Sequence, residues 1–154
     1  MTAPCRALAH PTRCAAVAVA LTALGAPGLA RSADTPPAPR LGLALNTLAP
    51  TEGGGCRLTF VIRNELGASL DTLVAEAVLF DRQGHVATMT LFDFGALPEG
   101  RPRVRQFDLA GQSCEAIGEV LVNGIGTCEG EGLAPAACLD GLRLSSDTDV
   151  EVTG

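Results

Sequence analysis

The chain has 154 residues, of which 47% are hydrophobic, so it suits one domain with a real core and is not generally disordered. Its 11 Lys+Arg residues are all arginine, they face 17 Asp+Glu, and aromatic residues make up only 3%. Without the leader arginines Arg6 and Arg13, 9 positive side chains remain (11 − 2) against 17 negative ones, a net charge near −8. That charge disfavours nucleic acid and anionic membranes as partners.

Residues 1–30 have the three-part order of a secretory signal peptide. Both leader arginines come before an apolar run at 14–24, and small residues lead up to the expected cleavage after Ala30, with a site two or three residues later as the alternative. The run is shorter than the ~20 residues of a membrane span, so we expect no span after cleavage. The protein is expected in the periplasm or secreted.

The rest of the chain divides into a linker and one domain. Residues 31–40 are rich in proline and lack periodicity, which is typical of a flexible linker, and residues 41–154 form the predicted domain. Alternating apolar and polar residues, cut by Gly, Pro and Asn turns, predict about seven strands. These expected strands lie at 41–50, 56–63, 73–80, 86–94, 101–109, 118–125 and 142–152.

The count and spacing of the strands predict a fold class and a core. We expect an all-β domain, a single immunoglobulin-like antiparallel β-sandwich. The side chains expected to be buried lie on the apolar side or at the centre of their strands; they are Leu58, Phe60, Ile62, Leu79, Leu91, Phe107, Leu121 and Leu144. Gly53, Gly54 and Gly55 are interpreted as a hairpin connection, because no strand–loop–helix context for a phosphate cradle surrounds them.

Four cysteines remain after the leader is removed, and four allow three pairings. If consecutive strands alternate in direction, Cys56 and Cys114 fall at one end of the sandwich, and Cys128 and Cys138 bracket a connection at the other. Bridged Cα atoms lie within ~7 Å, so these two pairs are predicted, and a crossover between strands would make Cys56–Cys128 the alternative. Close C-x₂₋₄-C zinc pairs and C-x-x-C redox motifs are absent from the sequence.

The remaining polar groups predict no catalytic, metal or cofactor site. His85 is the only histidine past the leader, at a hairpin tip, and there is no G-x-S-x-G, so we expect no enzyme. Two charged sets alternate along expected strands and are interpreted as balancing charges, a solvated edge or a partner surface. These sets are Arg101, Arg103 and Arg105, and Asp147, Asp149 and Glu151. The acidic set as a calcium site is disfavoured, because strand carboxylates at i, i+2 and i+4 spread over ~13 Å.

Two turn patterns carry a resemblance to a known family. Asn64 to Gly67, followed by Leu79-Phe80-Asp81-Arg82-Gln83-Gly84, resembles FxLYD-type immunoglobulin-like domains. Over the mature chain, the leader, the runs at 91–95 and 101–108, and Leu139-Asp140-Gly141-Leu142 resemble a group of uncharacterised small exported proteins of alphaproteobacteria. The resemblance implies a periplasmic setting and supplies no activity, substrate or catalytic residue.

These observations lead to one expectation about function and two alternatives. We expect a non-catalytic periplasmic β-sandwich module that binds a protein, with an envelope protein as the partner, or that is structural in the envelope. The first alternative is a small-ligand or metal-binding protein that uses the 128–138 loop or the acidic last strand. A hydrolase comes third.

Overall fold

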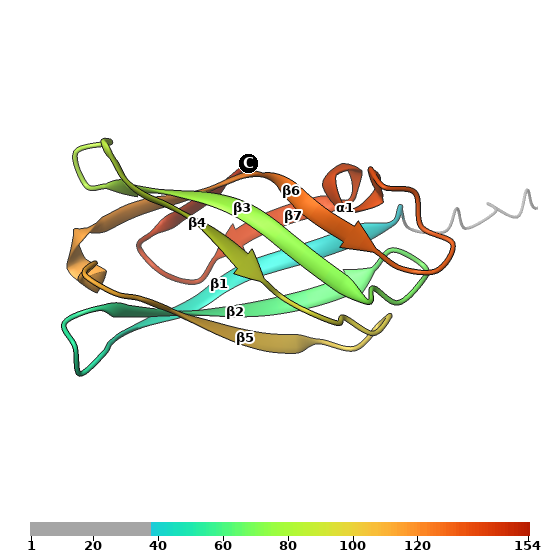
Figure 1. Ribbon diagram of the computed structural model, residues 1–154, viewed down its shortest axis with the longest axis horizontal. Coiled ribbons are helices and arrows are strands. Elements are labelled where there is room, and N and C mark those ends of the chain that lie inside the picture. Colours follow the sequence, from blue (N-terminus) through green and yellow to red (C-terminus); the bar gives the residue numbers. More distant parts are fainter. Residues whose placement is uncertain (1–37) are drawn as a thin grey trace, which may run out of the picture. The chain divides into compact units, whose positions relative to one another are not determined.

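The computed structural model describes residues 38–154, which fold into two packed four-stranded β-sheets (Figure 1). The first sheet has the strand order β5-β2-β1-β7, and the second has the order β4-β3-β6-β8. The strands are β1 (Arg40–Pro50), β2 (Cys56–Glu65), β3 (Thr72–Asp81), β4 (Val86–Asp93), β5 (Arg103–Leu109), β6 (Ile117–Glu129), β7 (Leu142–Ser146) and β8 (Glu151–Thr153). Two short helices complete the fold, the 3₁₀ turn η1 (Cys114–Ala116) and α1 (Ala137–Asp140).

The predicted all-β sandwich is confirmed, and the last part of the chain differs from the prediction. The segment 142–152 is not one strand: β7 ends at Ser146, and the chain crosses to the other sheet before β8 begins at Glu151. β7 pairs in parallel with β1, and β8 pairs in parallel with β6. Residues 38–154 therefore form eight strands in two mixed sheets, where antiparallel pairing throughout was expected. The segment 142–152 splits into two strands because β7 belongs to the first sheet and β8 to the second, and the chain has to cross between them.

The predicted signal peptide (1–30) and most of the linker (31–40) lie outside the described residues. At the linker's end the prediction was one residue off, because Arg40 is the first residue of β1 and carries an ion pair to Glu65 on β2 at 3.1 Å. Among the helices of residues 38–154, none is long and apolar enough to cross a membrane.

The core lies between the sheets and is aliphatic except at one side. Leu58, Phe60, Ile62 and Leu79 are buried as predicted. At the side where β2, β4 and β5 meet, four phenylalanine rings pack on one another with centroid separations from 4.5 to 6.3 Å. These rings belong to Phe60, Phe92, Phe94 and Phe107.

Four of the predicted core residues differ in burial from the prediction. Phe107 and Leu144 are half-buried and pack against the core from its margin. Leu121 lies opposite Val78 on the outer face of the second sheet, because Val120 and Val122 occupy the inner positions of β6. Leu91 is wrong as a core residue, since it is 63% exposed.

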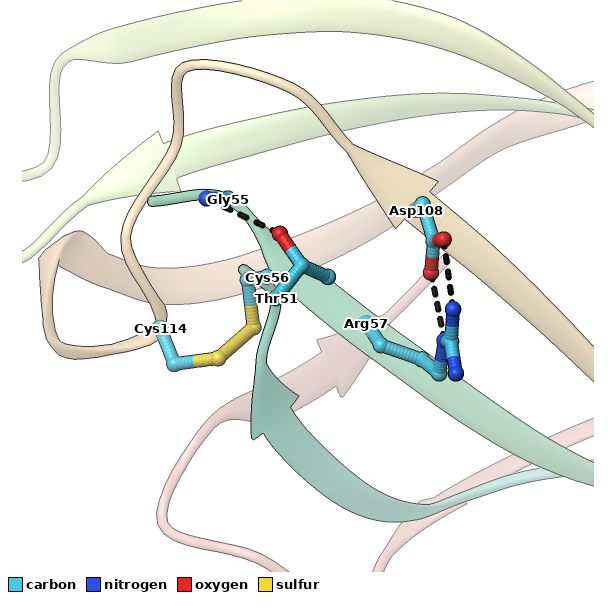
Figure 2. Close-up of a disulfide and its surroundings, with 6 residues drawn as sticks. All are labelled: Thr51, Gly55, Cys56, Arg57, Asp108 and Cys114. Carbon is cyan, nitrogen blue, oxygen red and sulfur yellow. Dashed lines mark hydrogen bonds and ion pairs between the residues drawn. A yellow bond between two sulfur atoms is a disulfide. The ribbon is translucent and has the colours of Figure 1, made fainter. Parts of the chain in front are cut away.

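Both predicted disulfides are present. Cys56 and Cys114 have Cα atoms 4.9 Å apart, and Cys128 and Cys138 have Cα atoms 6.0 Å apart. The first bridge forms because β2 and β5 are antiparallel, which places Leu109 opposite Cys56 and leaves η1 at the same end (Figure 2). The two bridges are compatible with an oxidising, exported location.

The three glycines before Cys56 form the β1–β2 hairpin turn, as predicted. The Gly55 amide donates to the Thr51 hydroxyl at 3.0 Å (Figure 2). Gly54 has a φ of +74°, a left-handed conformation that glycine adopts without steric cost.

Candidate functional surface

The most unusual surface of the described residues is an apolar area on the outer face of the second sheet. Val86, Met89 and Leu91 on β4 are 59%, 67% and 63% exposed. Opposite them on β3 stand Phe80, Val78 and Glu76 in the same order, and directly opposite residues point to the same face. We call Val86, Met89 and Leu91, with Val78 and Phe80 behind them, the β4 patch. The three β4 side chains turn apolar atoms to solvent, whereas Val78 is only 6% exposed.

The β4 patch lies on a strand that is also an edge of its sheet (Figure 1). An edge strand presents unpaired backbone N–H and C=O groups, and proteins commonly protect such edges with charges, proline or a short strand. β4 has eight residues and no proline, and its single charged residue, Asp93, is the last.

The other three edge strands are protected. β5 begins directly after Pro102 and carries Arg103, Arg105 and Asp108. β7 has five residues, one of them Arg143, and β8 has only three. Among the four edges of the described sheets, β4 is therefore the one most open to pairing with another strand.

Ordered polar turns border the β4 patch at both ends. Before β4, the Asp81 carboxylate accepts the backbone N–H groups of His85 and Gln83, each at 2.9 Å. These bonds, the one from His85 first, lower the pKa of Asp81 below its ordinary value. After β4, the Asp93 carboxylate accepts the Gly95 N–H at 2.8 Å. Hydrogen-bonded turns thus fix both ends of β4, while the apolar side chains in its middle are exposed to solvent.

The predicted arginine set lies at the beginning of β5. Arg105 donates to the carbonyls of Phe94 at 2.8 Å and Ala96 at 3.2 Å, and it thereby fastens the loop that follows β4. Arg103 donates to the Pro102 carbonyl at 3.3 Å, and Arg101 is exposed before the strand. The prediction that these arginines balance carboxylates is not supported, because the Arg–carboxylate pairs of residues 38–154 use Arg40, Arg57 and Arg82.

The predicted acidic set does not share one strand face, which corrects the sequence interpretation. Asp147 and Asp149 lie in the crossing between β7 and β8, and Glu151 begins β8. Asp147 accepts a hydrogen bond from the Asn46 amide at 3.0 Å, and the Asp149 carboxylate pairs with Arg82 at 2.8 Å. The hydrogen bond from Arg82, followed by its charge, lowers the pKa of Asp149.

The acidic set and the arginine set lie at opposite ends of the sandwich. Arg82, the partner of Asp149, also donates to the Glu115 carbonyl, beside the Cys56–Cys114 bridge. Arg103 instead pairs in register with Ile62, near the far end of β2. The two sets therefore do not form one site. Within residues 38–154, no three His, Cys, Asp or Glu side chains gather as ligands of a metal ion would.

A bidentate ion pair marks the outer face of the first sheet. Arg57 on β2 donates through Nε and Nη2 to both oxygens of Asp108 on β5, at 2.6 and 2.7 Å (Figure 2). The pairing lowers the pKa of Asp108 and raises that of Arg57. It ties edge strand β5 to its neighbour, so we interpret it as structural.

A second apolar feature is an open groove between β7 and β8, with a volume of about 400 Å³. Its walls include Leu142 and Leu144 of β7, Val152 of β8 and Leu139 of α1, with Arg143 as the charged residue. Leu139 is 55% exposed and follows the bridged Cys138. The groove therefore adjoins the disulfide loop that the sequence suggested as a ligand site.

Sequence reasoning missed the β4 patch, although one signal in the sequence could have found it. Phe92 and Phe94 occupy alternate positions, and Met89 and Leu91 belong to the opposite phase of the strand, so if both phenylalanines face the core, then Met89 and Leu91 face outward. It also missed Asn64, which is buried and whose amide donates to the carbonyls of Ala68 and Leu97 at 2.9 and 2.8 Å.

The chain matches no known protein-family model, no curated protein and no solved structure.

Proposed function

We propose that the protein is a non-catalytic periplasmic module that binds another protein through the β4 patch and the free edge of β4. The observation that carries the proposal is the coincidence of three exposed apolar side chains, Val86, Met89 and Leu91, with an edge strand that has no charge before Asp93. The predicted leader and both disulfides support the periplasmic setting, as does the resemblance to small exported alphaproteobacterial proteins and to FxLYD-type immunoglobulin-like domains.

Strand addition is the binding mode that this geometry favours. An extended segment that pairs with an edge gains backbone hydrogen bonds, and its alternate side chains pack on the neighbouring face. Burying a Leu or Met side chain completely is worth about 1.5–3 kcal/mol, so Met89 and Leu91 together supply a substantial part of the binding free energy. An envelope protein remains the partner class that we expect.

Capture from an envelope extract tests the proposal. The purified protein, immobilised with both disulfides formed, is expected to retain a specific partner, and Leu91→Glu should abolish retention by placing a charge in the β4 patch. The matched control is Val104→Glu, which alters a 56% exposed valine on β5 and should leave capture intact. Equal capture by the wild type and Leu91→Glu would refute binding through the β4 patch.

A small-ligand binder is the second candidate, because the groove between β7 and β8 is apolar and falls in the size range of ligand pockets. An apolar anionic dye such as anilinonaphthalene sulfonate tests it, since Arg143 adds a positive charge to the apolar wall. If the groove is the site, Leu139→Glu should weaken dye binding and Leu91→Glu should not. The reverse pattern would assign the dye to the β4 patch.

A further inference from the structure

We propose that the segment that pairs with β4 is β4 of a second copy of this chain, which gives a two-fold symmetric dimer with one continuous sheet across both sandwiches. The inference rests on the proposed function and names the partner. It follows from three properties of Val86–Asp93: the direction of its backbone groups, its symmetry and the position of its charges.

The backbone groups of Met89 and Leu91 point to the free edge. The Phe94 amide donates to the Leu73 carbonyl on β3 at 2.9 Å, just after β4 ends. Hydrogen-bonding direction alternates along an antiparallel strand, so the backbone groups of Phe92 and Thr90 also point to β3, and those of Leu91 and Met89 point away from it. Each copy therefore offers donors and acceptors at residues whose side chains belong to the β4 patch.

An antiparallel β4–β4 pair is self-complementary. A two-fold axis at Thr90 places Met89 of one copy opposite Leu91 of the other, twice, on the outer face. Opposite residues share a face, so the two β4 patches become one apolar surface across the junction. Inner positions likewise meet inner positions, since Thr88 opposes Phe92 of the second copy, and neither core is disturbed.

The positions of the charges allow this contact, although both copies are acidic. The predicted mature chain has a net charge near −8 (9 − 17), so two copies repel each other unless their contact is uncharged. Val86–Phe92 has no charged residue. When the two-fold axis lies at Thr90, Asp93 of each copy stands opposite Ala87 of the other copy. Ala87 is two residues from His85, and the two Asp93 side chains stay apart. A parallel arrangement would bring the two aspartates together.

The association state of the intact protein is the direct test. Sedimentation equilibrium over a concentration series should give a mass that rises to twice that of the monomer. Leu91→Glu should keep the monomer mass throughout the series, whereas Val104→Glu should behave as the wild type does. A wild-type protein that stays monomeric at every concentration overturns the inference.

Covalent trapping tests the register. Thr90→Cys places two thiols across the proposed axis, and mild oxidation should convert most of the protein to a covalent dimer. Gln106→Cys, on the exposed face of β5, is the control and should give little dimer. Equal trapping by both variants, or none by Thr90→Cys, overturns the β4–β4 junction.

The two proposals can fail separately. If the wild type is monomeric and Leu91→Glu loses capture of a different envelope protein, β4 binds a foreign strand: the function stands and the second copy is wrong. If Leu91→Glu changes neither mass nor capture, both proposals are wrong. If it changes the mass and the captured protein is the chain itself, both are supported.

Discussion

The structure shows which side chains of β4 point into the core and which point to solvent, and this facing of β4 has the clearest energetic consequence. The pair of variants Phe92→Ala and Leu91→Ala tests it. The two residues are neighbours in the chain and are both large and apolar. Phe92 is 2% exposed and its ring lies 4.5 Å from that of Phe107 and 5.5 Å from that of Phe60, whereas Leu91 is 63% exposed. Their truncations should therefore differ several-fold in cost.

The magnitudes follow from burial. Phe92→Ala removes a buried ring, worth about 1.5–3 kcal/mol, and leaves a cavity among the other phenylalanines, so the total loss should be about 3–5 kcal/mol. Leu91→Ala removes exposed atoms and should change the free energy of unfolding by about 0.5 kcal/mol or less. With a urea m value of about 2 kcal/mol/M, a loss of 4 kcal/mol lowers the midpoint by roughly 2 M.

Urea denaturation followed by far-ultraviolet circular dichroism measures both losses, because the chain has no Trp or Tyr to serve as a fluorescent probe. The disulfides should stay oxidised, and the protein concentration should be low enough to keep the wild type monomeric, so that dimerisation does not add to the stability. Equal losses for the two variants, or a larger one for Leu91→Ala, would refute the facing of β4 and, with it, the β4 patch.

Three further predictions concern the bridges, the turn and the surface ion pair. The double variant Cys128→Ser/Cys138→Ser should remain folded and lose about 3 kcal/mol in urea denaturation, because its bridge closes only a local loop; an unfolded product would contradict this. Gly55→Ala should cost about 1–3 kcal/mol, because a Cβ there meets the backbone carbonyl of the β5 end, whereas Gly53→Ala, with nothing within 4 Å, should be close to neutral in the same assay. The lowered pKa of Asp108 means that its ion pair adds stability above the ordinary aspartate pKa of about 3.9, and that this stability is lost as the pH falls through the lowered value. Stability curves of the wild type and Asp108→Asn should thus differ near neutral pH and converge in acid, and a gap that persists in acid would contradict the ion-pair account.

The sequence by itself determined where most of the chain is extended and where it turns, and it favoured one pairing of the thiols. The alternation from Cys56 to Arg63 and the glycine turn before it are local patterns, and they appear as β2 and the β1–β2 hairpin. The disulfide pairing followed from the assumption that consecutive strands alternate in direction, which they do even where the chain crosses from one sheet to the other. Both bridges lie where that alternation places them, Cys56–Cys114 at one end of the sandwich and Cys128–Cys138 at the other. Each of these inferences needs only the order of neighbouring segments.

Only the tertiary structure decided the facing of β4, the course of the last strand and hence the candidate site. Val86–Phe94 carries large apolar side chains in both phases of the strand, Met89 and Leu91 in one and Phe92 and Phe94 in the other, so periodicity alone does not choose between them. The choice is made by the rings of Phe60 and Phe107 on the opposite sheet, which Phe92 can reach and Leu91 cannot. Likewise, the split of residues 142–152 between two sheets depends on β1 and β6, which are far away in the chain. Whether a side chain is buried depends on which residues pack against it from the opposite sheet. The residues next to it in the sequence do not show which those are.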